Sequence, residues 1–359
     1  MTLAKEVILI FQIGSLGDTV ISMPCYREIA RRHPDAERYL LTNFPVASKA
    51  VPAAAILTPA GLIAGTIEYP MPIRRPTDIA KLYSRIRKLK ATTLYYLLPE
   101  KRITKLIRHY AFFRICGIGR ICGVPWSRDL RFPREVIEGK LWESEASRLL
   151  RTIGANTQPG PPAEADRDLG LSDEERIKAE LTLKQTDGLG RFVAISVGGK
   201  IPINDWGNKN WAYLLSELSS EDHGLGAIFV GSADERSRND LLAEAWHGPK
   251  FNSCGLLSPR ETAAILERAS LFIGHDTGTL HLAAAVRTRV IGIYSAREVP
   301  GKWFSDRLKD VFFYHHIECF GCKCVEIAEC PKGNLCIAAI DPDEVFEAAK
   351  AELVRSIAH

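Results

Sequence analysis

The sequence predicts an α/β protein of two doubly wound domains, each with a parallel sheet covered by helices, and three observations support this prediction. Apolar runs such as "EVILIFQI" (residues 6–13) are typical of parallel strands that are buried on both faces. Such runs alternate with stretches of helical length in two separate series. A segment rich in proline and charge, "QPGPPAEADRD" (residues 158–168), lies between the series and marks the linker. The predicted domains are residues 1–165 and 166–340, and a C-terminal helix follows at 341–359.

The first series begins with the apolar run at residues 6–13. Further strands are expected at "ERYLLT" (37–42) and "TLYYLL" (93–98), and helices at 18–32, 78–90 and 101–114. The helix at 18–32 is expected to bend or restart near Pro24, because proline removes a hydrogen bond inside a helix.

The second series repeats the same alternation. Strands are expected at residues 191–199, 226–232, 271–276 and 290–294, and helices at 172–183, 211–218, 234–246, 258–268 and 277–286. Ser258 and Glu261 have the spacing of a capping box. The last segment, from Asp341, is amphipathic, and Asp341 followed by Pro342 is typical of a helix start.

Composition limits the class of protein. The chain has 359 residues, of which 46% are hydrophobic and 25% charged, as in a globular protein. It contains no apolar run of the ~18 residues that a membrane span needs. The start, "MTLAKEVILIFQ", has no small-residue cleavage site, which favours a first strand over a signal peptide and predicts a cytoplasmic location.

Positive charge is concentrated in one segment. Between Met71 and Pro125 there are thirteen Lys or Arg and two acids, Asp78 and Glu100, which gives a net charge of +11. A basic surface attracts phosphates, anionic lipids or nucleic acid. The alternative is a pair of solvated helix faces, but few acids are spaced to pair with these cations along a helix.

Two turns have the same design, with glycine and aspartate between an apolar strand and a helix. They are "GSLGD" (14–18) and "GHDTGTLH" (274–281). The first N–H groups of a helix favour a bound anion, and ligands of open α/β sheets lie beyond the carboxyl ends of the strands. Neither turn has the pattern of a dinucleotide fingerprint or a P-loop. Each aspartate has a simpler interpretation as a helix cap, and His281 as a core histidine.

These regions resemble glycosyltransferase family 9, whose best-known members are ADP-heptose:lipopolysaccharide heptosyltransferases. The resemblance lies in "ILIFQIGSLGDTVISMPCYREIARRHPDAE", in "LFIGHDTGTLHLAAAVRTRVIGIYSA", and in "DWGNKNW", "FVGSADER" and "GLLSPRETAAILERAS". It implies a GT-B fold of two Rossmann-like domains that face each other across a cleft. It also implies an acceptor-binding N-terminal domain, a donor-binding C-terminal domain, and inverting transfer with no required metal or cofactor.

The resemblance also implies roles for individual residues. Asp18 matches the catalytic base, in a turn on the acceptor side formed with Gly14, Ser15 and Gly17. The implied donor-binding residues are Asp276, Thr277, Gly278, Thr279, His281, Lys200, Asn204, Asp234 and Glu235.

Three positions depart from the family pattern. Asn204 stands where members commonly have a phosphate-binding lysine; Lys200 or Lys209 could replace that lysine, but neither is in register with it. Arg289 stands where a proline is usual, and Ser295 where a glycine is usual. These departures leave the identity of the donor open.

Five cysteines lie close together in the sequence near the C-terminus: Cys319, Cys322, Cys324, Cys330 and Cys336. A structural zinc site usually takes four ligands, so five cysteines with one single-residue spacing fit it poorly. Structural thiols or a disulfide loop are the favoured interpretation and zinc is the alternative. Cys25, Cys116, Cys122 and Cys254 are expected in the core.

Three functions follow as hypotheses. The favoured one is a glycosyltransferase that extends a phosphorylated or lipid-linked saccharide, such as a lipopolysaccharide core, and makes peripheral contact with the inner membrane. It would transfer a heptose or a related sugar from a nucleotide-sugar donor, which is expected to be ADP-linked. It is not expected to bind nucleic acid. The alternatives are another GT-B enzyme, such as a nucleotide-sugar epimerase, and a non-catalytic sugar-nucleotide binder. Fold alone does not decide between them.

Overall fold

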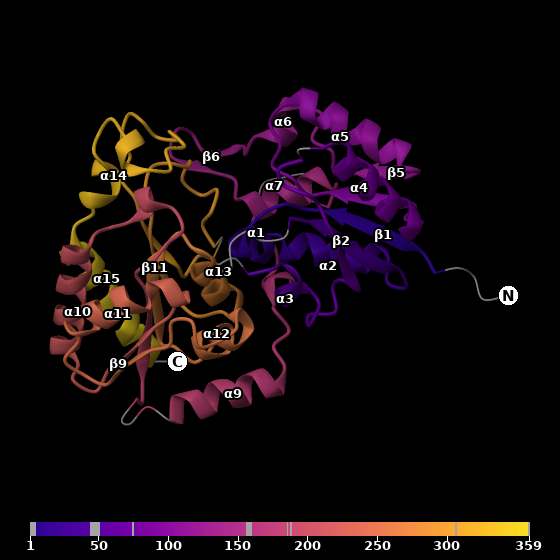
Figure 1. Cartoon of the computed structure of the whole chain (residues 1–359). Coiled ribbons are helices and arrows are strands. Elements are labelled where there is room, and N and C mark those ends of the chain that lie inside the picture. The colour runs from indigo at the N-terminus through magenta and orange to yellow at the C-terminus, as the bar shows by residue number, and fades with distance from the viewer. Residues whose placement is uncertain are drawn as a thin grey trace. The chain divides into compact units, whose positions relative to one another are not determined.

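The chain divides into two compact units. Its structure is a computed structural model that describes residues 5–43, 51–73, 75–155, 160–184, 186, 189–305 and 307–357. Unit 1 is Met1–Gly170 and unit 2 is Leu171–His359 (Figure 1). Residues 158 and 159 of the predicted linker lie outside the described part, and its remainder belongs to unit 1 and contains the short helix α8 (Glu164–Arg167).

The sheet of unit 1 is parallel and has the strand order β3-β2-β1-β4-β5. The strands are β1 (Val7–Phe11), β2 (Glu37–Thr42), β3 (Gly65–Glu68), β4 (Thr93–Tyr96) and β5 (Arg120–Cys122). The order reverses between β1 and β4, and ligands of open α/β sheets bind beyond such a reversal. The turn after β1 begins at this position.

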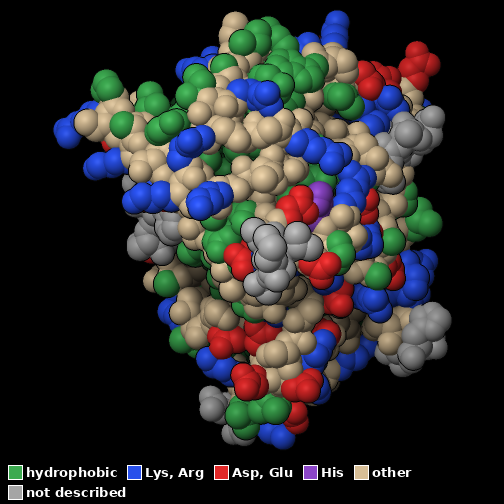
Figure 2. Space-filling view, turned by 90° about the vertical axis from the view of Figure 1, so that its right-hand side faces the viewer, with side chains coloured by type: hydrophobic (Ala, Val, Ile, Leu, Met, Phe, Trp, Pro, Cys, Tyr) green, Lys and Arg blue, Asp and Glu red, His purple; other side chains and the backbone are tan. Residues whose placement is uncertain are grey.

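Helices cover this sheet. They are α1 (Leu16–Ile21), α2 (Met23–Arg32), α3 (Ala54–Leu57), α4 (Pro76–Leu89), α5 (Ile103–Ile115), α6 (Arg128–Arg131) and α7 (Glu145–Thr152). The predicted restart near Pro24 is confirmed, because α1 ends at Ile21 and α2 begins with Met23 and Pro24. Helices α4 and α5 bury Leu82 and Leu106 in one apolar cluster with β1. Blue side chains of Lys and Arg are frequent in the upper part of Figure 2, which draws the right-hand side of Figure 1.

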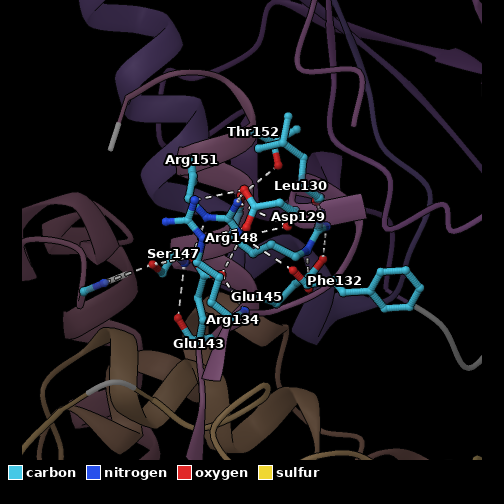
Figure 3. Close-up of polar contacts among 12 residues, drawn as sticks. Asp129, Leu130, Phe132, Arg134, Glu143, Glu145, Ser147, Arg148, Arg151 and Thr152 are labelled. Carbon is cyan, nitrogen blue, oxygen red and sulfur yellow. Dashed lines mark hydrogen bonds and ion pairs between the residues drawn. The ribbon is translucent and has the colours of Figure 1, made fainter. Parts of the chain in front are cut away.

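A network of buried charges holds α7 against α6 and a small hairpin formed by β6 (Glu135–Ile137) and β7 (Leu141–Trp142) (Figure 3). Arg148 is 1% exposed, and its Nε donates to Oε2 of Glu145 at 2.9 Å and its Nη1 to the carbonyl of Leu130 at 2.7 Å. Arg151 pairs with Glu143 at 2.7 Å and with Asp129 at 2.9 Å. This network fixes the path of α6, which is too short to hold its place by packing alone.

Unit 2 has a second parallel sheet, with the order β10-β9-β8-β11-β12-β13. The strands are β8 (Phe192–Ser196), β9 (Gly226–Phe229), β10 (Lys250–Asn252), β11 (Leu271–His275), β12 (Val290–Ile293) and β13 (Val311–Phe313). Here the order reverses between β8 and β11. The turns after these two strands are therefore at the ligand-binding position of this sheet.

The helices of unit 2 pack on both sides of this sheet. They are α9 (Asp173–Lys184), α10 (Asn208–Glu221), α11 (Arg236–Ala243), α12 (Pro259–Leu266), α13 (Gly278–Ala285), α14 (Leu335–Ala338) and α15 (Pro342–Ile357), with short 3-10 turns η1 (Pro202–Asn204), η2 (Ala233–Glu235) and η3 (Ile327–Glu329). The predicted capping box of α12 is confirmed: Glu261 N donates to Ser258 Oγ, and Ser258 N to Glu261 Oε2. Among the described residues, no helix is long and apolar enough to cross a membrane.

The structure corrects several predicted elements. The edge strands β3, β5, β10 and β13 were not expected, because each has only three or four residues and no long apolar run. Helix α10 begins at Asn208, three residues before the predicted start, and the segment expected as one helix at 234–246 is η2 followed by α11. The backbone division lies between Gly170 and Leu171, five residues beyond the predicted domain boundary.

The buried pair of Arg148 and Glu145 gives a first prediction. We expect Arg148→Met to lower the free energy of unfolding by about 3–5 kcal/mol, because it removes the guanidinium that pairs with the buried Glu145 carboxylate. The double variant Arg148→Met/Glu145→Leu should recover part of this loss. Urea unfolding monitored by circular dichroism measures both effects.

Lys184→Met is the matched control, because Lys184 forms an exposed ion pair with Glu180 at 2.9 Å. It should cost no more than about 1 kcal/mol. Equal losses for Lys184→Met and Arg148→Met would contradict the role of burial.

Candidate active site

The turn after β1 holds Asp18 by its first helical turn. Ser15 is the N-cap of α1, and Asp18 is the third residue of that helix. The backbone N–H of Ser15 donates to Oδ2 of Asp18 at 2.6 Å, and the Ser15 hydroxyl donates to the same oxygen at 2.7 Å. Within the described part of the chain, no hydrogen bond reaches Oδ1. The carboxylate is thus fixed through one oxygen and has the other available.

Gly14 makes room for this carboxylate. A Cβ atom at position 14 would lie 2.5 Å from Cβ and 2.8 Å from Oδ2 of Asp18. The N–H of Gly14 donates to Oδ1 of Asn43 at 3.0 Å, which joins the turn to the end of β2. Gly14 and Ser15 are exposed, whereas Gly17, predicted to face the acceptor, is buried in α1.

Gln12 supports the turn from below and was missed at the sequence level. Its Nε2 donates to the backbone oxygen of Asp18 at 3.0 Å and to Ser22 Oγ at 2.7 Å. The hydroxyl of Tyr26 donates to Gln12 Oε1. Gln12 is 4% exposed, so these bonds satisfy a buried amide and set the angle between α1 and α2. A polar residue directly after an apolar strand was the available signal.

The turn after β11 leads into α13. Thr277, not Asp276, is the N-cap, which corrects the interpretation of Asp276 as a cap. The hydroxyls of Thr277 and Thr279 lie 2.7 Å apart, and that of Thr279 lies 2.9 Å from Ser196 Oγ at the end of β8. These bonds join the ends of β8 and β11, and Gly278 begins the helix whose first N–H groups face this edge.

His281 and Asp276 form a pair on the first turn of α13. Nε2 of His281 lies 3.6 Å from Oδ1 of Asp276, and the histidine side chain is 5% exposed. The imidazole therefore lies under the turn and contacts the aspartate, which is 17% exposed. Asp276 is the member of the pair that a ligand can reach.

Glu235 lies at the ends of β8 and β9. Its Oε2 accepts the N–H of Ser232 at 2.6 Å in a capping box of η2. A Cβ atom at Gly198 would lie 1.9 Å from Glu235 Oε1, so the carboxylate covers the backbone just after β8. Asp234 is exposed. Of the two predicted acids, Glu235 is the one placed at the strand ends.

Two positions that depart from the family pattern contact each other. The hydroxyl of Ser295, after β12, donates to Oδ1 of Asn204 at 2.6 Å. Asn204 is 3% exposed, so this side chain is enclosed in the protein, and Lys200 is exposed nearby in sequence. The prediction that Asn204 binds the donor directly is not supported by this burial.

His275, the last residue of β11, organises the neighbouring segment and was not singled out from the sequence. Its Nε2 accepts the backbone N–H of Trp206 at 3.1 Å and the indole N–H of Trp211 at 3.3 Å. A ring nitrogen that accepts two hydrogen bonds has no proton. Burial lowers the pKa of His275 to about 4, and the nearby Asp205 carboxylate only partly opposes this shift.

A pocket opens beside Asp276 at the ends of β11 and β12. It is lined largely by aromatic side chains and by a few polar ones: Asp276, Tyr294, Ser295, Arg297, Glu298, Val299, Pro300, Trp303, Phe304, Tyr314 and Phe320. The hydroxyl of Tyr294 donates to the carbonyl of Trp303 at 3.1 Å, and burial raises the pKa of this tyrosine. The pocket is small, with room for about one water molecule, so in this structure it does not hold a ring-sized ligand.

The cysteine-rich segment follows this pocket. All nine cysteines are free thiols, so the disulfide loop is not formed. Among the described residues, no three His, Cys, Asp or Glu side chains are grouped so that they could hold a metal ion. Within this segment the thiol of Cys324 forms a hydrogen bond with the thiol of Cys322, which raises the pKa of Cys324. The zinc alternative stays a prediction. Cys25, Cys116 and Cys254 are buried as predicted, whereas Cys122 is partly exposed.

Comparison with known proteins identifies the relatives of this chain. Residues 150–318 match the family described as "Glycosyltransferase family 9 (heptosyltransferase)". The family 9 resemblance is confirmed. The chain is 27% identical over 119 residues to lipopolysaccharide heptosyltransferase 3 of Escherichia coli, and this alignment covers 32% of the chain and 35% of that relative. The match thus spans about a third of the curated relative.

Solved structures confirm the GT-B type of fold. A glycosyltransferase of family 9 from Veillonella parvula has a TM-score of 0.71 at 15% identity, covering 99% of both chains. The Escherichia coli ADP-heptose lipopolysaccharide heptosyltransferase II has a TM-score of 0.69 at 16% identity, covering 98% of this chain and 99% of that one. The iron-containing glycosyltransferase TibC of enterotoxigenic Escherichia coli has a TM-score of 0.54 at 14% identity, covering 99% of this chain and 79% of that one.

The neutral state of His275 gives a prediction about pH. Because its pKa is about 4 in the folded protein and about 6.5 when unfolded, protonation favours the unfolded state between these values. The contribution of neutral His275 to the free energy of unfolding is fully present above pH 6.5. It should fall by up to about 1.4 kcal/mol per pH unit as the pH drops toward 4. Denaturant unfolding at several pH values, followed by tryptophan fluorescence, measures this slope.

His275→Gln removes the titrating group and should flatten this slope. His109→Gln is the control, because the pKa of His109 is also lowered to about 4 by burial but this residue lies in unit 1. If the free energy of unfolding of unit 2 depends on pH as strongly in His275→Gln as in the unmodified chain, His275 is not the titrating group.

Proposed function

We propose that the chain is an inverting glycosyltransferase that needs no metal and moves a heptose or related sugar from an ADP-linked donor. The acceptor is a lipopolysaccharide core or another phosphorylated or lipid-linked saccharide. The observation that carries this proposal is the Asp18 carboxylate, which lies where the strand order reverses between β1 and β4. One of its oxygens is held by Ser15 and the other is available. The names of the two Escherichia coli heptosyltransferases support the choice of sugar and acceptor.

Asp18 acts as the general base in this proposal. Its Oδ1 takes the proton from an acceptor hydroxyl while that hydroxyl oxygen forms a bond to the anomeric carbon of the donor. The bond from the anomeric carbon to the diphosphate breaks, and its electron pair leaves with the diphosphate. Because attack comes from the face opposite the leaving group, a single displacement inverts the anomeric configuration.

The turn that begins α13 stabilises the leaving diphosphate. The N–H groups of Gly278 and Thr279 belong to the first turn of an eight-residue helix, where unpaired donors and the helix dipole favour negative charge. Since the diphosphate gains charge as the bond breaks, these donors act on the transition state more than on the ground state. Asp276 and Glu235 are acceptors for sugar or ribose hydroxyls, and Lys200 is available for a phosphate.

No step of this mechanism uses a metal. The backbone donors and Lys200 supply the positive potential instead. In this proposal, unit 1, which contains Asp18, binds the acceptor, and unit 2, which contains the α13 turn, binds the donor.

A thermal-shift panel with ADP, UDP, GDP, CDP and NAD at equal concentrations tests the donor. A nucleotide present at about 100 times its Kd should stabilise the protein by about 2.7 kcal/mol. We expect ADP to give the largest shift. A response to another diphosphate would replace ADP in the proposal, and a response to none of them would overturn the donor site.

Asp18→Asn tests the catalytic base. Asparagine has the same shape and still accepts the Ser15 N–H, but it does not take a proton. We expect kcat for transfer to fall by about 10²–10⁴, with little change in donor affinity or in Tm. Release of nucleoside diphosphate with the donor found above measures the rate.

Asp35→Asn is the matched control, because Asp35 is exposed and lies just before β2, at the end of the sheet opposite to Asp18. It should keep most of the activity. Full activity of Asp18→Asn would exclude the base, and diphosphate release without any acceptor would favour a hydrolase or an epimerase.

A further inference from the structure

Helix α5 has apolar residues on the side that faces solvent. Ile103, Ile107, Ala111 and Ile115 are spaced four residues apart and therefore form one stripe along the helix. All four are exposed, and the three isoleucines have exposed fractions of 40%, 55% and 68%. The opposite side of α5 is already buried, with Leu106 and Phe113 in the core. The stripe is thus not needed for packing within unit 1.

Cationic side chains flank this stripe. Arg102, Arg108 and Arg114 lie on or next to α5 and are exposed. In the part of the chain that the structure describes, Arg102 and Arg108 have no ion-pair partner, and the Arg114 guanidinium donates only to carbonyls at the end of the helix. Long arginine side chains let an apolar helix face approach a lipid surface while their charge stays at the headgroups.

Aromatic side chains stand at the edge of the stripe. Trp126 is 44% exposed, and its ring packs edge-on against Tyr110 of α5 with centroids 5.4 Å apart. Phe132 is 38% exposed, and Nζ of Lys101 lies 5.2 Å from the centre of its ring. Tryptophan and tyrosine are enriched at the boundary between lipid and water, because their rings are apolar and their polar atoms stay hydrated.

Helix α4 extends this surface. Its buried side shares the core cluster of α5, so both helices cover the same face of the sheet. Ile79 and Tyr83 are four residues apart on α4 and exposed, and Lys81 and Lys88 of the same helix are exposed as well. Figure 2 shows green apolar and blue cationic side chains next to each other in the upper part of the face that it draws.

Contacts on two sides hold the short helix α6 next to the start of α5. Nη1 of Arg131, in α6, donates to the carbonyl of Lys101 just before α5. The buried network of Figure 3 holds Asp129 and Leu130 of the same short helix from the other side. These contacts tie α6, and Phe132 directly after it, to the segment that begins α5.

We propose that the outer faces of α5 and α4 dock unit 1 on an anionic phospholipid bilayer. The isoleucine stripe enters the boundary between headgroups and acyl chains, Trp126 and Tyr110 lie at the boundary, and the arginines and lysines contact lipid phosphates. A second copy of the chain fits less well, because the flanking cations would face each other. Nucleic acid would contact the cations but leave the aliphatic stripe without a partner, since bases stack on aromatic rings.

This proposal goes beyond glycosyl transfer. Docking uses a surface remote in sequence from Asp18 and the α13 turn, and it requires neither donor nor acceptor. Binding to lipid and transfer of sugar can therefore be measured separately, and the failure of one leaves the other standing.

Co-sedimentation of the full chain with vesicles tests it. One set contains phosphatidylglycerol and phosphatidylethanolamine, and the other contains phosphatidylcholine alone. We expect binding to the anionic vesicles at least tenfold tighter than to the neutral ones, and weaker at high salt because the charges are screened. Ile107→Glu/Ile115→Glu should reduce anionic binding at least tenfold.

The matched control is Ile177→Glu/Leu181→Glu. These residues also form an exposed apolar pair four residues apart, on α9, with exposed fractions of 56% and 55%. The lysines beside them are paired with acids, Lys178 with Glu261 at 2.5 Å and Lys184 with Glu180 at 2.9 Å, so little positive charge is left to attract an anionic surface. The control should bind vesicles like the unmodified chain. Arg108→Gln, which leaves the stripe intact, should weaken binding about fivefold.

Four results would overturn the proposal. They are equal binding to both kinds of vesicle, equal loss in the α9 control, retention of binding in Ile107→Glu/Ile115→Glu, and a concentration-dependent dimer that this variant abolishes. If Ile107→Glu/Ile115→Glu has no cooperative thermal transition, the single variant Ile115→Ser is used in its place, because Ile115 is the most exposed of the three isoleucines. Competition by single-stranded DNA that removes the protein from vesicles at equimolar phosphate would favour nucleic acid instead.

Discussion

At the carboxyl end of each buried strand, the chain leaves a sheet that pairs its N–H groups and enters a helix whose first N–H groups have no partner within the helix. In this protein, carboxylates satisfy several of these groups. Asp18 accepts the N–H of Ser15 at the start of α1, and Glu235 accepts the N–H of Ser232 at the start of η2. The same requirement therefore stabilises the helices and collects charged side chains at the ligand-binding edge of each sheet.

The sequence predicts the central strands well, because β1, β8, β9 and β11 are continuous apolar runs that need little tertiary context. The edge strands were not predictable, because a strand of three or four residues is defined by its neighbour in the sheet and not by its own composition. The roles of Gln12 and His275 were hidden for the same reason. His275 is recognised only through Trp206 and Trp211, which precede it by more than sixty residues.

The candidate site, too, could be predicted from the sequence only in part. The motifs place Asp18, Asp276 and the α13 turn correctly at the strand ends, because strand-to-helix turns have local signatures. They do not reveal which side chains are enclosed. Asn204 and Ser295 were each noticed as departures from the family pattern, and the structure shows that they bond to each other. Arg289, the third departure, is explained by an ion pair of 2.6 Å with Glu352 of α15.

Helix α15, which is synthesised last, completes the core of unit 2. Its Val345, Ala349 and Leu353 belong to the core cluster of unit 2, together with residues of β8 and α10. Arg191, just before β8, also donates to the carbonyl of Leu353, so the first and last parts of unit 2 lie against each other. Among the described residues, the sheet of unit 1 and the core cluster that contains Leu82 and Leu106 include no residue beyond 170. During translation, unit 1 can fold while unit 2 is still emerging from the ribosome, whereas unit 2 has an open core until residue 353 has left the exit tunnel. A chaperone that binds the nascent chain would therefore protect the apolar strands of unit 2 for longer than those of unit 1.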